Sequence, residues 1–183
     1  PEDSGWNNLA AGLKYVVIAD TENQFALTAG ARIEFASGQK KILQGGVDEF
    51  SPFVSVAKGW DRFHLLANVS PRFALDGGDG NNVFQWSLHA DYEIFKGVAP
   101  LIELHGLHYL DNGDRTPLPI GGLDYTNLGS TDVSGNHVYW LGLGGEIKLT
   151  PNVCVGATYE FALTDPKDDI MDNRMTFSLH LTW

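Results

Sequence analysis

The last ten residues, RMTFSLHLTW at positions 174–183, alternate strictly between apolar and polar side chains. One face of an extended strand would carry Met175, Phe177, Leu179, Leu181 and Trp183. Successive side chains of a strand point to opposite faces, whereas a helical period of about 3.6 residues would scatter the apolar set round the cylinder. The segment is therefore predicted to be a β-strand with one apolar and one polar face.

The same alternation recurs along the whole chain. It is regular over 25–35, 63–73, 84–94, 139–149 and 154–163, and less regular over 9–19, 50–58 and 100–110. Together with the last segment, these predict about nine strands of roughly ten residues each and no helix of consequence.

Short and long connections take turns between the predicted strands. The short turns fall at 20–23, 58–61, 96–99 and 150–152, and the long, polar connections at 37–49, 76–82, 111–137 and 164–173. In an up-and-down meander this order places all short turns at one end and all long loops at the other. Such asymmetry, with strands of this length, is typical of a membrane-spanning β-barrel. Residues 1–183 are therefore predicted to form a single, all-β, antiparallel up-and-down transmembrane barrel.

Alternation alone does not say which face points inward, because a soluble lipocalin-type barrel has the same period with the apolar face inside. Large rings, however, gather near the strand ends of the apolar face, as in the two aromatic girdles of a membrane barrel. No charge interrupts that face in the regular strands. The apolar face is therefore predicted to contact lipid, with a girdle of Phe25, Phe35, Phe63, Phe73, Phe84, Trp86, Tyr92, Tyr139, Phe161 and Trp183.

The opposite face mixes small residues with charges of both signs, as expected of a polar lumen. The predicted lumen-lining residues are Lys14, Arg32, Glu34, His64, Asn68, Arg72, His89, Asp91, Glu93, Glu103, His105, Glu146, Lys148, Glu160, Arg174 and His180. Five of these are basic and six are acidic, with the histidines counted as neutral. An open pore of this composition is expected to discriminate weakly by charge, with a slight preference for cations.

Composition excludes several other classes. The formal net charge of −11 argues against a nucleic-acid partner. The single Cys154 excludes an internal disulfide framework and a cysteine-based metal cluster. The sequence contains no run of about 18 apolar residues, so no transmembrane helix is predicted. No signal peptide is recognisable, and Pro1 is expected to be a mature or truncated start.

The Ser, His, Asp and Glu residues of the polar face are more readily explained as ordinary lumen residues than as catalytic or metal-binding groups. Ser87 with His89, and Ser178 with His180, share the polar face, but a Ser/His lipid hydrolase needs nucleophile and base in contact. His89, Asp91, Glu93, Glu103 and His105 are of ligand type, yet a hydrogen-bonded network is the commoner outcome. We therefore predict no catalytic residue, no metal and no cofactor. GLGGE (142–146) lies within a strand, so Gly142 and Gly144 are expected to make room for Trp140 or another inward side chain.

The quoted C-terminal strand resembles that of Gram-negative outer-membrane β-barrels, and the resemblance in pattern extends over the whole chain. In that family the last strand, usually ending on Phe, is the signal recognised by the barrel-assembly machinery. The resemblance carries this role to Phe177, Leu179, Leu181 and Trp183, with Trp183 departing from the usual Phe. It also implies contact with membrane lipid and lipopolysaccharide in a bacterial outer membrane. More weakly, DEFSPFVSVAKGWDRFHLLANV (48–69) and LIELHGLHYLDNG (101–113) resemble proposed transporter barrels of a phenol-degradation pathway.

Strand parity leads to a further expectation. If the last strand ends in the periplasm, residues 9–19 begin at the outer surface, whereas bacterial barrels normally have an even number of strands. We expect a parent barrel of about ten to twelve strands; the alternative is that 9–19 is not a wall strand and the barrel has eight. The expected function is passive or facilitated passage of small solutes, and the alternative is a closed structural or adhesion barrel with a salt-bridged lumen. The acidic long loops are expected to be solvated, with divalent-cation bridging to lipopolysaccharide as the alternative.

Overall fold

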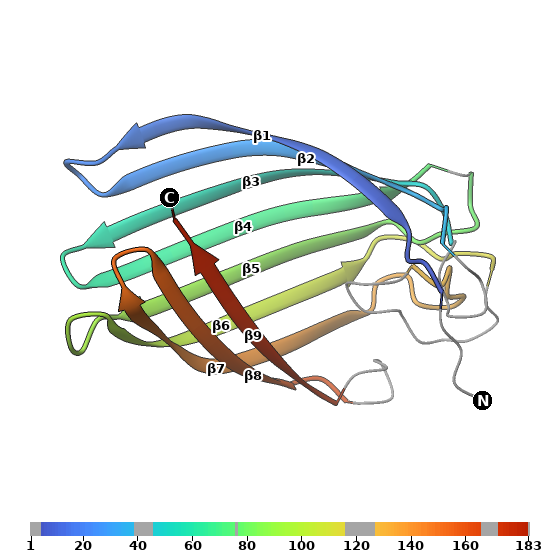
Figure 1. The fold of residues 1–183 in the computed structure, drawn as a ribbon. Helices are drawn as coiled ribbons and strands as arrows, with labels where there is room; N and C mark the ends of the chain where they lie inside the picture. Colours follow the sequence, from blue (N-terminus) through green and yellow to red (C-terminus); the bar gives the residue numbers. More distant parts are fainter. Residues whose placement is uncertain (1–4, 39–45, 76, 116–126, 166–171, 183) are drawn as a thin grey trace.

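The computed structural model describes residues 5–38, 46–75, 77–115, 127–165 and 172–182, and it contains one antiparallel sheet of nine strands in chain order (Figure 1). The strands are β1 Leu9–Asp20, β2 Phe25–Phe35, β3 Glu49–Trp60, β4 Phe63–Ala74, β5 Val83–Tyr92, β6 Val98–Tyr109, β7 His137–Thr150, β8 Val153–Ala162 and β9 Asn173–Leu181. The predicted up-and-down all-β fold is confirmed, and residues 9–19 belong to a wall strand, so the eight-strand alternative is wrong. In the described part of the chain, no helix is long and apolar enough to cross a bilayer.

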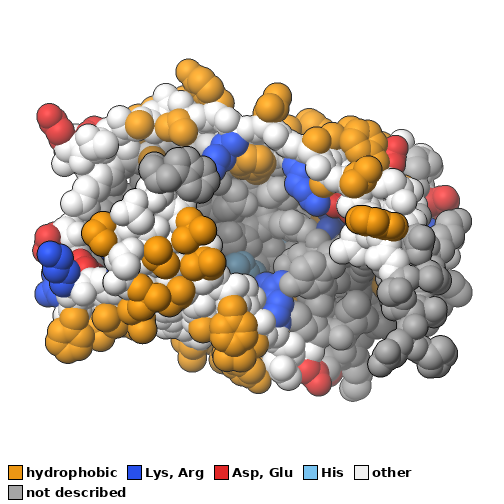
Figure 2. Space-filling model, viewed as in Figure 1, with side chains coloured by type: hydrophobic (Ala, Val, Ile, Leu, Met, Phe, Trp, Pro, Cys, Tyr) orange, Lys and Arg blue, Asp and Glu red, His pale blue; other side chains and the backbone are white. Residues whose placement is uncertain are grey.

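The sheet curls about its long direction and leaves β1 and β9 as its two edges (Figure 1). Each neighbouring pair keeps an antiparallel ladder over most of its length, with bulges between Val16 and Ile18 and between Lys148 and Thr150. Over the described residues no ladder joins β1 to β9. Figure 2 shows the molecule hollowed on the face that the curl encloses.

Cross-strand pairing keeps the two faces of the sheet distinct. Leu88, for example, pairs with Ala67 on one side and Leu104 on the other, whereas Ser87 pairs with Asn68 and His105. We call the face of Leu88 the outer face and the face of Ser87 the inner face. On β9 the outer face carries Phe177, Leu179 and Leu181 with 74%, 62% and 56% of their surface exposed. The outer face is therefore a nearly continuous apolar surface open to its surroundings.

The short turns all lie at one end of the sheet and the long loops at the other (Figure 1). The second turn is tighter than the sequence predicted, because β3 continues through Trp60 and only Asp61 and Arg62 connect it to β4. Asp61 has a positive φ of 58°, the left-handed conformation that such a turn requires. The third turn begins earlier than predicted, since β5 ends at Tyr92.

An aromatic cluster lies on the outer face near the long-loop end. The indole of Trp86 covers Gly106 of the next strand so closely that a Cβ there would lie 2.4 Å from the ring. Its Nε1 donates a hydrogen bond of 3.0 Å to Nε2 of His108, and the Trp86 and Tyr139 rings are 6.2 Å apart. Gly106 therefore creates the space that fixes this part of the girdle.

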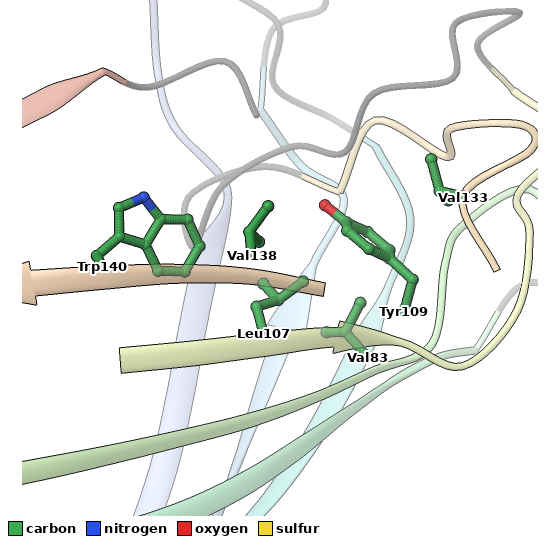
Figure 3. Packing of buried hydrophobic residues seen from close by; sticks show 6 residues of the cluster. All are labelled: Val83, Leu107, Tyr109, Val133, Val138 and Trp140. Atoms are coloured by element: carbon green, nitrogen blue, oxygen red, sulfur yellow. The ribbon is translucent and has the colours of Figure 1, made fainter. Parts of the chain in front are cut away.

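On β5–β7 the inner face at the long-loop end is apolar, which the sequence did not predict. Its side chains are buried and pack with Val133 of the β6–β7 connection in a cluster of Val83, Leu107, Tyr109, Val133, Val138 and Trp140 (Figure 3). Val133 comes from the loop itself, and the other five come from β5, β6 and β7. Asn81 and Asn127 tie the same loop down by reciprocal hydrogen bonds of 3.0 Å and 2.7 Å. The β6–β7 connection is thus partly a lid that folds onto the sheet.

The face assignment predicts a large difference between two neighbouring lysine substitutions. Leu88→Lys places a charge in the middle of the outer face, and in a bilayer it should lower the free energy of unfolding by about 2–4 kcal/mol. Ser87→Lys places the same charge on the polar inner face and should cost much less. Urea unfolding in lipid vesicles, followed by the gel shift between folded and heated protein, measures both values. Equal losses would contradict the assignment.

Candidate functional site

One row of cross-strand partners crosses the inner face from edge to edge. In strand order the row reads Ala19, Ala26, Ala57, Leu66, His89, Glu103, Gly142, Glu160 and Arg174. The four residues on β1–β4 are uncharged and mostly small, whereas four of the five on β5–β9 are ionisable. The inner wall therefore has a small-residue half and a charged half.

A continuous series of contacts between histidines, carboxylates and one arginine, which we call the histidine–carboxylate chain, runs from β4 through the charged half. Its members are His64, Asp91, His89, Glu103, His105, Glu160 and Arg174. At the β4 end, Nδ1 of His64 lies 2.7 Å from Asp91, whose other carboxylate oxygen is 3.3 Å from Nε2 of His89. The Nδ1 atom of His89 is 2.8 Å from Glu103. Because both ring nitrogens of His89 face carboxylates, this imidazole bridges two strands.

The other end of the chain is anchored by a two-pronged ion pair. Arg174 donates from Nε to Glu160 at 2.5 Å and from its terminal nitrogen at 2.7 Å. Nε2 of His105 lies between the two carboxylates, 3.7 Å from Glu103 and 3.5 Å from Glu160. The Glu160 side chain is only 3% exposed, so its charge depends on these partners for compensation.

Gly142 makes this arrangement possible, because it occupies the row position between Glu103 and Glu160. A Cβ at this position would lie 2.9 Å from Thr158, 3.2 Å from Cγ of Glu160 and 3.3 Å from Cβ of Glu103. The sequence predicted that the glycines of 142–146 make room for an inward side chain. For Gly142 the neighbours that use the space are the two carboxylate side chains and Thr158.

Cavities follow the small-residue half. One of about 430 Å³ lies at the short-turn end of β1–β5, and another of about 360 Å³ lies on β2–β6; both are lined by Ala26, Ala57 and Leu66. The second also reaches Glu103, which lines a third cavity of about 250 Å³ on β6–β9. The three cavities thus form a series along the inner face, from the small-residue half to the charged half, in which neighbouring cavities share lining residues.

A second group of charges lies on the inner face of β2–β4 near the long loops. Arg72 is 3.3 Å from Glu49, with both side chains 6% exposed. Arg32 is 2.6 Å from Glu34, which also accepts a hydrogen bond of 2.9 Å from Asn8. Both arginines therefore pair with carboxylates near the end of the sheet that carries the lid.

The remaining predicted lumen residues are more scattered. Lys14 and Lys148 are on the inner face, and within the described residues neither forms an ion pair. Asn68 donates a hydrogen bond of 2.6 Å to Ser55, and His180 is 3.8 Å from Glu146 at the short-turn end. Glu93 departs from the expectation, because it follows β5 and its carboxylate accepts a hydrogen bond of 2.6 Å from the Gly97 amide, capping the turn.

The residues predicted to form the aromatic girdle and the assembly signal lie on the outer face where the structure describes them. By register, Phe25, Phe35, Phe63, Phe73, Phe84, Trp86, Tyr92, Tyr139 and Phe161 lie there, whereas Trp183 is outside the described residues. The sequence analysis missed Trp60, which stacks on Phe63 at 5.9 Å and lies under Lys58 at 5.4 Å. Trp60 was assigned to the turn predicted at 58–61; the signal that could have identified it is that Val54, Val56, Lys58 and Trp60 continue the same alternation.

The chemical alternatives find little geometric support. In the described segments, no hydrogen bond joins Ser87 to His89 or Ser178 to His180, and no group of three metal-ligating side chains has the geometry to hold an ion. Of the loop acids, Asp111 accepts hydrogen bonds of 2.7 Å and 2.5 Å from Asn82 and so acts as a loop anchor. Asp76, Asp124, Asp168 and Asp169 lie outside the described residues.

Comparison with known proteins identifies the fold. No protein-family model and no curated protein matches the sequence. The structure is similar to a crystal structure of the NanC porin, with a TM-score of 0.65 and 10% sequence identity, over 96% of this chain and 79% of that chain. This chain has a porin-like β-barrel fold. The predicted resemblance to that class is confirmed, whereas the weaker similarity to phenol-pathway transporters stays a prediction.

The pairing of Glu160 with Arg174 predicts a double-mutant result. Arg174→Met leaves a buried carboxylate without its main partner and should lower the free energy of unfolding by about 3–5 kcal/mol. Adding Glu160→Gln removes that charge and should recover part of the lost free energy of unfolding. The matched control is Arg32→Met, because the Arg32 side chain is 50% exposed and its pair with Glu34 should contribute less than about 1 kcal/mol. Urea unfolding in lipid vesicles gives all the values, and a full, unrelieved loss in the double variant would contradict the pairing.

Proposed function

We propose that this protein is a bacterial outer-membrane channel for the passive or facilitated passage of small solutes. The observation that carries the proposal is the separation of the two faces: an apolar outer face with girdle rings, and a hollow inner face with small and charged side chains. An apolar exterior suits lipid, and a polar, hollow interior suits water and solutes. The similarity in fold to the NanC porin supports the same proposal.

The proposed path runs along the small-residue half of the inner wall. Ala26, Ala57 and Leu66 line two of the cavities there and carry no charge. The histidine–carboxylate chain borders this path, with His64 and Asp91 lining its short-turn end and the other members in the charged half, and it supplies the electric field of the path. A channel further requires that β1 and β9 be joined in the membrane, directly or through further strands, because an open edge exposes unpaired backbone groups to lipid.

The proposed partners follow from the outer face. Membrane lipid would contact the aliphatic band, lipopolysaccharide would meet the long-loop end, and the barrel-assembly machinery would read the strand that ends at Trp183. We propose no enzymatic activity and no nucleic-acid partner.

The lid favours one alternative, a closed barrel that serves as a structural or adhesion element. Val133 and the buried inner-face side chains fill the long-loop end of the hollow beneath the lid. A channel needs a passage beside this cluster, and a closed barrel does not.

Refolding into lipid vesicles followed by planar-bilayer recording tests the proposal. The folded protein should run apart from the heated form on a denaturing gel and should give steady conductance. A protein that stays monodisperse in buffer without detergent would contradict the membrane proposal. A folded, heat-modifiable protein without conductance would favour the closed barrel.

Two alanine-to-tryptophan substitutions on the neighbouring strands β3 and β4 test the path itself. Ala57→Trp places a large ring in the small-residue half and should reduce single-channel conductance by about half or more. Ala67→Trp, which points to the outer face between Val56 and Leu88, should leave the conductance unchanged. Equal conductance in both variants would show that ions do not pass along Ala57.

A further inference from the structure

We propose that His64, His89 and His105 set the charge selectivity of the channel and reverse it from cation to anion preference as the pH falls from about 8 to about 5.5. The inference rests on the proposed channel function and adds the residues that determine its selectivity. It follows from the composition and the geometry of the histidine–carboxylate chain.

Three imidazoles alternate in this chain with three carboxylates, and the chain ends on one guanidinium. With neutral imidazoles, Asp91, Glu103, Glu160 and Arg174 leave it with two net negative charges. With all three imidazoles protonated, it carries one net positive charge. Histidine is the side chain whose charge ordinarily changes between pH 5 and 8, a range in which most carboxylates stay ionised. Protonation of the three imidazoles would therefore reverse the sign of the chain.

Each imidazole faces a different set of charges. His64 pairs with Asp91 on β5, and Asp20 and Lys58 line the same cavity. The charged neighbours of His89 are Asp91 on its own strand and Glu103 on β6; its β4 partner in the row is the uncharged Leu66. Each ring nitrogen of His89 thus lies beside a carboxylate oxygen.

His105 lies in the most crowded part of the chain. Glu103 is on its own strand and Glu160 on β8, with Arg174 behind Glu160 on β9; Ser87 and Trp140, its cross-strand partners, carry no charge. Glu146 and His180 line the same cavity nearer the short turns. His180 is a further imidazole on the inner face, so its share must be measured separately.

The position of the chain gives it control over selectivity. His89, Glu103, Glu160 and Arg174 lie in one register row, and His64, Asp91 and His105 lie in the inner-face rows on either side of it. The residues of that row on β1–β4 carry no charge. Arg32 and Arg72 already pair with carboxylates near the lid. An ion that passes Ala57 at this level therefore meets a field whose source is the chain opposite. Salt weakens the field, since the Debye length falls from about 30 Å at 0.01 M to about 3 Å at 1 M.

The experiment is the reversal potential of the wild-type channel under a salt gradient in planar bilayers, at pH 8.0 and at pH 5.5. We expect a cation-to-anion permeability ratio above one at pH 8.0 and below one at pH 5.5, with a smaller change at high salt. A ratio that stays on the same side of one at both pH values overturns the proposal while leaving the channel function intact. Absence of conductance from a folded protein overturns both.

Histidine-to-glutamine variants test whether the pH-dependent change in selectivity comes from the histidine–carboxylate chain. The triple variant His64→Gln, His89→Gln, His105→Gln should keep its cation preference at both pH values, and each single variant should lose part of the change. The matched control is His137→Gln, because His137 is exposed on the outer face and should leave the pH dependence unaltered. His180→Gln measures the share of the remaining inner-face imidazole.

The variant outcomes separate the proposal from general titration of the protein. A triple variant that still reverses its preference, or a His180→Gln variant that alone abolishes the reversal, overturns the assignment. If the triple variant does not refold, the three single variants are compared with His137→Gln. Single variants that keep the full pH-dependent change in permeability ratio of the wild type also overturn the assignment.

Discussion

The antiparallel ladder is the constraint on which the rest of this structure depends. Each strand satisfies its backbone groups only through its neighbours, and the pairing fixes which side chains stand opposite one another. A slip of one residue in any ladder would move lipid-facing side chains to the interior and charges to the exterior. The apolar girdle, the hollow and the histidine–carboxylate chain therefore all depend on the same register, and the row from Ala19 to Arg174 shows that this register is kept across eight successive ladders.

Within that register, charge compensation decides which polar residues the inner wall holds. Glu160 is almost fully buried, and an isolated carboxylate in such a place would be strongly destabilising. Arg174 compensates it in a two-pronged geometry, and His105 links it to Glu103. Gly142 is as important as the charges, because a larger residue there would push the two glutamates apart. The same principle operates on the outer face, where the missing side chain of Gly106 admits the ring of Trp86.

The fold was largely predictable from the sequence, because a period of two residues is a local signal that every strand repeats. The strands, the face assignment and the alternation of turns and loops all follow from it. The site was predictable only in part: the alternation placed His89, Glu103 and Glu160 on one face, but register is a property of two strands and gave no contacts in advance. Glu93 illustrates the limit, since its parity is that of an inward residue, yet the strand ends at Tyr92 and the side chain caps a turn. The lid was missed for a related reason. Val83, Leu107 and Val138 have inward parity in strands expected to face water, and only the return of residues 127–136 explains why they are apolar.

The division of the inner wall into two halves has a consequence for how such a protein can change. On β1–β4 the side chains of the row are small and bear no charge, so substitutions there alter the bore and leave the electrostatics alone. On β5–β9 the ionisable side chains of the row each contact at least one oppositely charged or hydrogen-bonding partner, so substitutions alter the electrostatics and are penalised unless a partner changes as well. In the proposed channel, width and charge preference are thus set mainly by different strands. In such a channel, a lineage or an engineer can change the size of what passes by substitutions on one half of the sheet and leave the sign preference of the other half largely unchanged.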